Sequence, residues 1–480
     1  MYNFIFGSHF LNKRFKVQFY FLTFLLCSIH LLAQIDDQYR DLPPLTIADR
    51  DSVIQKISEL LLENYVFEDV GIKCSNYILE HLQKGSYEDY EDYLDFANRL
   101  TEDLQKISKD KHLRVRVRKP DYSRMEQVDP LTAEYQQRVY DERKNMGFQK
   151  LEILQGNIGY LQLSEFAPVE IAGKKAAGVM RFLEHTDAVI FDLRENDGGS
   201  PALVQYISSF FFDKPTHLNS LYWRVADRTD EYWTLEDVDG KQRPDVPLFI
   251  VTSKNTFSSA EEFAYNLQTR KRATIVGEST AGGANPGGMI NINDNFGVFV
   301  PMGRAINPVT GTNWEGVGVK PNIKVKANNA LNVAMDKAAK AAGKYREKNE
   351  MENMKILEKT QKALYEGLNM YAANQVNSAD SLVNSVLNAC LNSDLAEEYT
   401  LNSLGYNYLS KKSYQLAIAI FKFNADKFPN SWNAFDSLGE AYMKSGDRDL
   451  AIFNYQKSLN INPDNENAKQ MLTKLENTVN

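Results

Sequence analysis

The chain has 480 residues, of which 43% are hydrophobic and 11% aromatic, so it can form a packed core and global disorder is not expected. A chain of this length is expected to form about three domains. The formal net charge of −8 at pH 7 argues against nucleic acid as the main partner.

The first residues carry a targeting pattern. Lys13, Arg14 and Lys16 precede the apolar run "VQFYFLTFLLCSIHLLA", and Ala33 is a small residue suited to cleavage. This pattern predicts a signal peptide at residues 1–33 and a secreted or periplasmic protein. Because the apolar run is slightly long, an uncleaved N-terminal anchor is the alternative. No later stretch is long and apolar enough to span a membrane.

The cysteines and histidines do not indicate a disulfide framework or a metal centre. Cys27 lies within the signal segment, where Leu26 before it disfavours lipidation. The remaining Cys74 and Cys390 fall in different predicted domains, so a disulfide is not implied. The sequence has neither HExxH nor CxxC, and no metal is expected.

Residues 44–112 are predicted to form an N-terminal helical domain without chemistry of its own. The segment "DRDSVIQKISELLLENYVF" places an apolar stripe on one helical face, and "YLDFANRLTEDLQKI" repeats the pattern. The stripe consists of Val53, Ile54, Ile57, Leu60 and Leu61.

Residues 113–328 change to short apolar strands that alternate with helices. "NIGYLQL", "DAVIFDL", "PLFIVT" and "ATIVGE" have strand length and β-branched character, and "KKAAGVMRFLEH" and "SAEEFAYNLQTRK" have helical spacing. This alternation predicts an α/β core whose strands are buried on both faces. In "RVRVRK", the alternating Arg114, Arg116 and Arg118 are expected on the solvated face of a strand rather than in a nucleic-acid site.

The C-terminal part is repetitive. Leu404, Gly405, Tyr408, Ala417, Phe421 and Pro429 recur 34 positions later (439 − 405 = 34) as Leu438, Gly439, Tyr442, Ala451, Tyr455 and Pro463. This period and pattern predict two tetratricopeptide repeats over residues 396–475. Residues 329–395 are expected to be a charged helical connector with a weaker third copy near Gly367 and Ala379. The repeats either bind a protein partner on a concave surface or only pack against the core.

Two serines precede the helical segment of "NTFSSAEEFAYNLQ". Ser258 stands three residues before Glu261, which is the signature of a capping box. A hydroxyl at this place also lies where helix N–H groups and the macrodipole favour negative charge. On this segment alone the cap is favoured over a nucleophile.

Glycine-rich segments follow two of the predicted strands. "AVIFDLRENDGGS" ends in Gly198 and Gly199, whose amides are either part of an ordinary turn or suited to an oxyanion hole. "GESTAGGANPGG" (277–288) lacks the lysine of a P-loop, so phosphate binding is not expected.

Taken together, "DLRENDGG", "TSKNTFSSAEEF", "ATIVGESTAGGANPGG" and "NWEGVGVKPNIKV" resemble the C-terminal-processing and tricorn-type serine peptidase family, which includes the interphotoreceptor retinoid-binding protein modules. The likeness covers about residues 45–328 in order. The helical preface ending "LTEDLQKISKDKHLRV" is similar to the retinoid-binding and bacterial tricorn-like branch. The resemblance implies a Clp-protease/crotonase-like core.

The resemblance also implies a site. Ser258 occupies the nucleophile position, and Ser259 with Gly198 or Gly199 would supply oxyanion amides. One branch uses a lysine of the glycine loop as general base, but Gly283 stands there, and no lysine occurs between positions 271 and 320. The other branch uses a histidine, which His112 matches.

The acidic member of that branch matches Glu315, 57 residues beyond the nucleophile (315 − 258 = 57). Histidine is suited to this role because its pKa lies near neutrality, and an acid supports it. The family's serine before the histidine is replaced by Lys111, so what orients His112 is open.

Each of these residues also has an ordinary structural explanation. His112 could cap a helix or pack at the start of a strand, and Glu315 could be an exposed turn residue. His185 and His217 are rival bases, expected to be surface or structural residues.

The sequence therefore predicts a secreted or periplasmic serine endopeptidase acting on peptides or proteins through Ser258, His112 and Glu315, without metal or organic cofactor. The alternatives are a non-catalytic protein that binds an apolar ligand on the same scaffold, and a scaffold protein that acts through its repeats.

Overall fold

The structure is a computed structural model that describes residues 43–118 and 129–477, and the predicted signal peptide and Cys27 lie outside these residues. The chain divides into two compact units, Met1–Gly343 and Lys344–Asn480. None of the described helices combines the length and low polarity needed to cross a bilayer. The expected α/β core with helical regions before and after it is confirmed.

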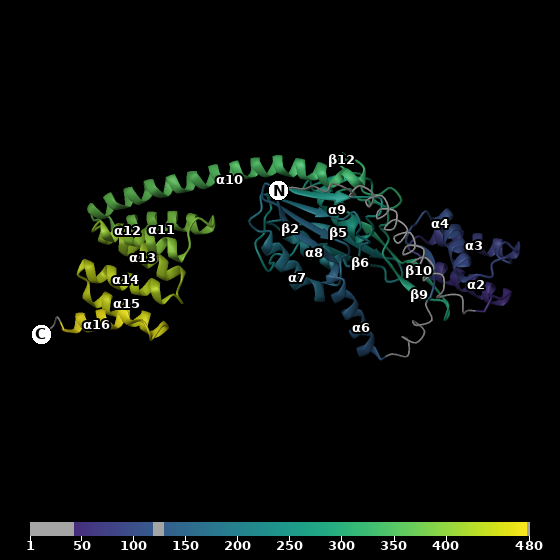
Figure 1. Ribbon diagram of the computed structural model, residues 1–480, viewed down its shortest axis with the longest axis horizontal. Coiled ribbons are helices and arrows are strands. Elements are labelled where there is room, and N and C mark those ends of the chain that lie inside the picture. Colours follow the sequence, from purple (N-terminus) through teal and green to yellow (C-terminus); the bar gives the residue numbers. More distant parts are fainter. Residues whose placement is uncertain (1–42, 119–128, 478–480) are drawn as a thin grey trace, which may run out of the picture. The chain divides into compact units, whose positions relative to one another are not determined.

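The first unit is centred on a six-stranded sheet of order β12-β8-β7-β4-β3-β2, in which only β2 runs antiparallel to its neighbour. Figure 1 labels its two edge strands, β2 and β12. Its strands are β2 (Phe148–Leu154), β3 (Ile158–Leu163), β4 (Ala188–Asp192), β7 (Leu248–Thr252), β8 (Ala273–Gly277) and β12 (Ile323–Lys324). Four of them match the predicted strands. All residues of β4 and β7 are buried, as expected of parallel strands covered on both faces.

Helices cover both faces of this sheet. They are α7 (Val169–Phe182), α8 (Pro201–Ser209), α9 (Ser259–Thr269) and the start of α10 (Ala327–Ala372). On one face, small residues of α10 spaced by four pack on the strands, namely Ala330, Ala334, Ala338 and Ala342. On the other face, Phe263 of α9 packs against Phe191 of β4, with ring centroids 5.1 Å apart. This packing fixes α9, which directly follows the predicted nucleophile Ser258.

The N-terminal helices share a core with a strand from much later in the chain. The helices are α2 (Ile47–Asn64), α3 (Glu68–Gln83) and α4 (Tyr93–Ser108), and the predicted apolar stripe of α2 is buried. They pack on an antiparallel sheet of order β1-β10-β9, made of β1 (Arg114–Val117), β10 (Phe296–Pro301) and β9 (Gly287–Asn291). Phe296, Val298 and Val300 of β10 belong to this core. The segment between α4 and β1, which carries His112, is thereby held against the α/β core.

A third antiparallel sheet has the order β11-β5-β6, with β5 (His217–Trp223), β6 (Arg228–Trp233) and β11 (Gly303–Ile306). Helix α6 (Pro130–Arg143) and a 3₁₀ turn at Asn145–Gly147 precede β2.

The second unit is all helical. It contains the remainder of α10, then α11 (Val376–Asn392), α12 (Glu398–Ser410), α13 (Tyr414–Lys427), α14 (Trp432–Ser445), α15 (Arg448–Ile461) and α16 (Glu466–Asn477). The predicted small residues lie at helix–helix contacts. A Cβ added at Gly405 would lie 2.5 Å from the Phe421 ring, and one added at Gly439 would lie 3.0 Å from the Tyr455 ring. These glycines let paired helices approach closely.

Candidate active site

Ser258 lies between β7 and α9 in an unusual backbone conformation. Its φ of 55° and ψ of −123° differ from the extended conformation that an N-cap residue usually adopts. Its N–H donates to Glu261 Oε2 at 2.9 Å, which supplies the backbone half of the predicted capping box. A Cβ at Gly198 would lie 2.7 Å from Ser258 Cβ, so a glycine is needed where that turn touches the serine. A strained residue at the start of a helix is a common feature of functional sites.

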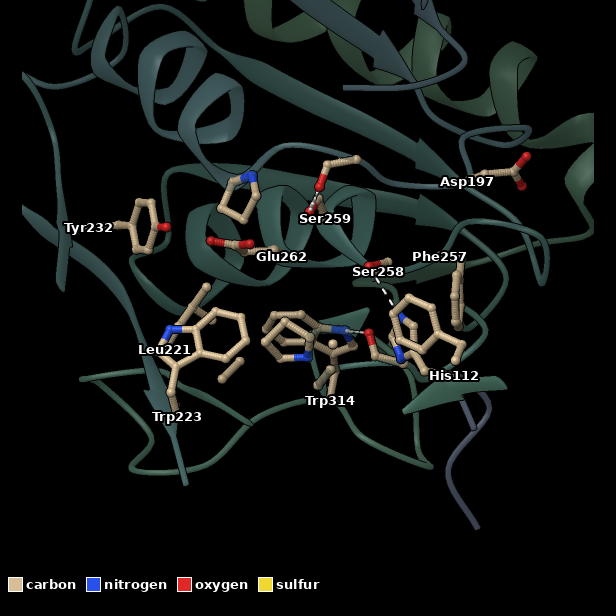
Figure 2. Close-up of a pocket in the computed structure, with 18 of the residues that line it drawn as sticks. His112, Asp197, Leu221, Trp223, Tyr232, Phe257, Ser258, Ser259, Glu262 and Trp314 are labelled. Atoms are coloured by element: carbon tan, nitrogen blue, oxygen red, sulfur yellow. Dashed lines mark hydrogen bonds between the residues drawn. The ribbon is translucent and has the colours of Figure 1, made fainter. Parts of the chain in front are cut away.

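His112 faces Ser258. The His112 Nε2 atom lies 3.2 Å from Ser258 Oγ (Figure 2). The imidazole is buried, stacks on Phe299 with ring centroids 5.6 Å apart, and packs at a tilt against Phe257 with ring centroids 4.4 Å apart. Burial, with a smaller effect from Arg114, lowers the pKa of His112 to about 4. The ring is therefore neutral at pH 7 and can accept a proton from the hydroxyl.

Gly283 borders the same ring. A Cβ at position 283 would lie 2.2 Å from the Phe257 ring and 2.7 Å from His112 Cε1. The space that a side chain at 283 would need is thus already filled by the imidazole and its aromatic neighbour.

Two carboxyl groups lie near the other ring nitrogen. Asp110 Oδ1 is 3.9 Å from His112 Nδ1, and the backbone N–H of His112 donates to the same oxygen at 2.9 Å. Asp110 Oδ2 accepts hydrogen bonds from the Tyr65 hydroxyl and the Asn285 amide. Glu315 Oε2 accepts from the Ala284 N–H at 2.5 Å.

This cluster is incompletely hydrogen-bonded. Among the described residues, His112 Nδ1 and Glu315 Oε1 are buried without a partner. Burial, followed by the charge of Asp110, raises the pKa of Glu315 to about 8, and burial also raises the pKa of Asp110. The two carboxyl groups therefore retain a proton at neutral pH, as expected of closely spaced buried acids.

Asp110, His112 and Glu315 are also the described residues that could hold a metal ion, because each offers a ligand atom within 4.8 Å of the others. A neutral histidine and two carboxylates are suitable ligands for a divalent metal. A shared proton accounts for the same cluster without a metal.

The sequence-based prediction of the site included Glu315 and His112 but not Asp110. Its only sequence signal is its position two residues before His112 in "KDKHLRV". Lys111, which stands where a serine was expected, directs its Nζ to the carbonyl of Ala281.

The predicted oxyanion amides are not equivalent. The Gly198 N–H donates to Asn196 Oδ1 at 2.9 Å and is therefore occupied. No hydrogen bond of the Gly199 or Ser259 N–H occurs within the described part of the chain. The Ser259 hydroxyl donates to the Gly199 carbonyl at 2.8 Å and holds the two residues together. The arrangement favours Gly199 and Ser259 over Gly198 as oxyanion donors.

A cavity of about 440 Å³ opens beside Ser258 and His112. Arg114 lines it and is half-buried, so the expectation that the arginines of this strand only face solvent is wrong for Arg114. The strand itself is confirmed as β1. Burial lowers the pKa of Arg114, and the nearby Asp197 opposes this shift.

The rival histidines lie away from this cavity. The side chain of His185 is 91% exposed, and His217 stacks on Trp233 at 4.6 Å. Neither lines the cavity beside Ser258.

Comparison with known proteins gives three matched segments. Residues 157–325 match "Peptidase family S41", and residues 47–145 match "N-terminal domain of Peptidase_S41 in eukaryotic IRBP". Residues 432–465 match a tetratricopeptide repeat.

Similar curated proteins are processing peptidases. The chain is 30% identical over 154 residues to the carboxyl-terminal-processing protease of Synechocystis sp., covering 32% of this chain and 34% of that protein. It is 30% identical over 168 residues to the chloroplastic carboxyl-terminal-processing peptidase 2 of Arabidopsis thaliana, covering 34% and 31%. The chain thus spans about a third of the length of these relatives.

Similar solved structures include the photosystem II D1 C-terminal processing protease, with a TM-score of 0.31 and 21% identity over 38% of this chain and 46% of that one. A lipoprotein from Streptococcus agalactiae has a TM-score of 0.39 and 13% identity, covering 62% of this chain and 96% of that one.

Proposed function

We propose that this chain, which belongs to peptidase family S41 through residues 157–325, hydrolyses peptide bonds by a Ser258–His112 mechanism supported by a buried carboxyl pair. The observation that carries the proposal is the 3.2 Å separation of Ser258 Oγ and His112 Nε2. This distance is at the upper end of hydrogen-bond reach, as is common in sites without substrate.

In this mechanism Ser258 Oγ attacks the substrate carbonyl while His112 Nε2 takes the hydroxyl proton. The Gly199 and Ser259 N–H groups stabilise the negative charge on the carbonyl oxygen. His112 then gives the proton to the leaving amine, and an acyl-enzyme remains on Ser258. Water, activated by His112, hydrolyses that ester and restores the serine.

The carboxyl pair is proposed to support the imidazolium that forms in each step. Asp110 Oδ1 is 3.9 Å from His112 Nδ1, so a small closure brings the two atoms into hydrogen-bond reach. Glu315 lies beside Asp110, and the proton shared by the pair limits the repulsion between the two acids. Both act through His112 and are positioning residues.

The test compares Ser258→Ala with Ser410→Ala, which changes an exposed serine of α12. The first variant is expected to lose labelling by a fluorophosphonate and to lose peptide hydrolysis by roughly 10⁶-fold, as in other serine peptidases. The second should retain both. Labelling of Ser258→Ala at the rate of the unaltered chain would overturn the proposal.

Residues 1–33 support a secreted or periplasmic location, since a basic segment precedes their apolar run. We further propose that the repeats bind a protein partner, because stacked helix pairs of this kind present an extended concave surface. Their match to a tetratricopeptide repeat supports this.

A further inference from the structure

The cavity beside Ser258 has an end that the proposed mechanism does not use. His112, Phe257 and Gly283 line the cavity near the serine. Leu221, Trp223, Tyr232 and Glu262 line the side away from the His112 ring (Figure 2). Trp314 lies between the two sides, and its Nε1 donates to the Gly283 carbonyl. Figure 2 shows the Glu262 carboxylate on the side of the cavity that carries Tyr232, away from the His112 ring.

Glu262 is placed by helix geometry. It is the fourth residue of α9 (Ser259–Thr269), whose N-cap is Ser258, and both residues line the same cavity. The residue is only 4% exposed. Its carboxylate forms no ion pair within the parts of the chain that the structure describes. The ionised form of an acid buried in this way is costly without a cation, so a cation brought by the substrate would stabilise it.

The preceding residue provides the contrast. Glu261 is also buried, but its carboxylate accepts hydrogen bonds from the Ser258, Gly282 and Gly283 N–H groups and from the Thr280 hydroxyl. These four donors account for Glu261 as a structural acid that ties the glycine loop to α9.

Glu262 has no such set of donors. Among the described residues, the side-chain amides of Asn219 and Asn266 oppose a rise in its pKa, but burial has the larger effect and raises this pKa to about 7. Its carboxyl group is thus poised to lose a proton when a cation approaches.

The walls next to Glu262 are apolar. Leu221, Trp223, Tyr232 and Trp314 present aliphatic and aromatic surface to the cavity. A lysine or arginine side chain matches this environment, because its methylene stem packs on apolar surface while its charged end seeks an acid or an aromatic face. The other charged lining residues, Arg114 and Asp197, interact with each other, so they do not oppose a cation at Glu262.

We propose that this part of the cavity receives the side chain of the residue before the scissile bond and selects lysine or arginine, with Glu262 as the specificity-determining residue. The inference rests on the proposed function. The carbonyl attacked by Ser258 belongs to that residue, whose side chain therefore enters the cavity nearest to Ser258 and Gly199.

The test uses peptide aminocoumarin amides that differ only in the residue before the scissile bond, so that no residue after the bond contributes. The kcat/KM for lysine and arginine is expected to exceed that for norleucine, which has a similar stem without charge, by at least about tenfold. In Glu262→Gln this ratio should fall at least about tenfold, and Glu262→Asp should restore part of it. The matched control Glu231→Gln, an exposed acid on the adjacent β6, should leave the ratio unchanged.

A second measurement needs no variant. Lysine-like and norleucine-like diphenyl phosphonates are compared for their rates of labelling Ser258 in the unaltered chain, and the lysine-like reagent should react faster. Equal or faster labelling by the norleucine-like reagent overturns the specificity inference while leaving the serine mechanism in place. Absence of labelling by both reagents, and by a fluorophosphonate, overturns the proposed function itself.

Discussion

In both the helical repeats and the α/β core, glycines leave room for a ring side chain that packs against them, but the consequences differ. In the repeats, Gly405 faces Phe421 and Gly439 faces Tyr455, each 16 residues later (421 − 405 = 16; 455 − 439 = 16). In the core, Gly283 faces His112, 171 residues earlier (283 − 112 = 171). The contacts in the repeats let two helices pack closely together, and the contact in the core leaves room for the proposed general base. In the repeats, the 34-residue period of the sequence identifies both the glycine and the nearby ring that it contacts. In the core, the ring that contacts the glycine is far away in sequence and can be identified only from the structure.

The largest expected effect comes from filling the space at Gly283. In Gly283→Ala the new methyl group would meet the Phe257 and His112 rings and displace the imidazole. We expect kcat/KM to fall roughly 100-fold or more, since a displacement of about 1 Å in a catalytic group has this effect. Gly178→Ala, in α7 with open space around it, is the control and should keep its activity. Unchanged kcat/KM in Gly283→Ala would show that, contrary to our expectation, Gly283 is not needed to position His112.

The corresponding change in the repeats should affect stability alone. Gly405→Val forces atoms against the buried Phe421 ring, and overpacking of this kind costs about 2 kcal/mol. The melting temperature of the helical unit Lys344–Asn480 should fall, while kcat/KM for hydrolysis of a short peptide should stay constant. A parallel loss of peptide hydrolysis would contradict the separation of roles.

The carboxyl pair should make the stability of the core depend on pH. The folded-state pKa of Glu315 is raised to about 8, so its contribution to stability is complete below about pH 4.5 and is lost as pH rises towards 8. Glu315→Gln mimics the protonated form, and its Tm should fall less between pH 7 and 8 than that of the unaltered chain, by a few degrees at most.

Other groups change the stability mainly below the interval from pH 7 to 8 in which the two chains are compared. Burial raises the pKa of Glu261 and Glu262 to about 7, and the lowered pKa of His112 has its effect between about pH 4 and 6.5, with the opposite sign. Parallel curves of Tm against pH above pH 7 for the variant and the unaltered chain would show that Glu315 is ionised in the folded state.

The smallest expected effect concerns backbone strain. In the repeats, the positive φ of 92° after α14 belongs to Gly446, which adopts it freely, whereas in the core a positive φ of 55° belongs to Ser258. Ser258→Gly should therefore be more stable to urea than Ser258→Ala by about 1 kcal/mol, although both are inactive. Equal stability of the two inactive variants would indicate that the conformation of Ser258 is not strained.

Much of the fold followed from local patterns. The strands at 158–163, 188–192, 248–252 and 273–277, the helices around them and the repeat helices all have strong periodicity or β-branched runs. The assignment of strand β10 to the core of the N-terminal helices was not predictable, because its residues reveal their partners only through long-range pairing.

The candidate site was foreseen in part, through motifs rather than geometry. Ser258, His112 and Glu315 came from a family resemblance, and the structure brings the serine and the histidine together and places Glu315 with Asp110 behind the ring. Asp110 and Glu262 escaped notice because a lone acid in a sequence does not show whether it will be buried. The role of Asp110 depends on its burial beside His112, and that of Glu262 on burial without an ion pair among the described residues, which are properties of the assembled core.

The glycine at position 283 also limits how the proposed histidine base could be exchanged for a lysine base during evolution. A lineage that exchanged a histidine base for a lysine base through single replacements would pass either through a chain holding both, where the two groups collide, or through a chain holding neither, where no proton acceptor remains. We expect both intermediates to be inactive, so the histidine-base and lysine-base forms would be separated by a fitness valley. An engineer converting one form into the other must therefore replace His112 and Gly283 together.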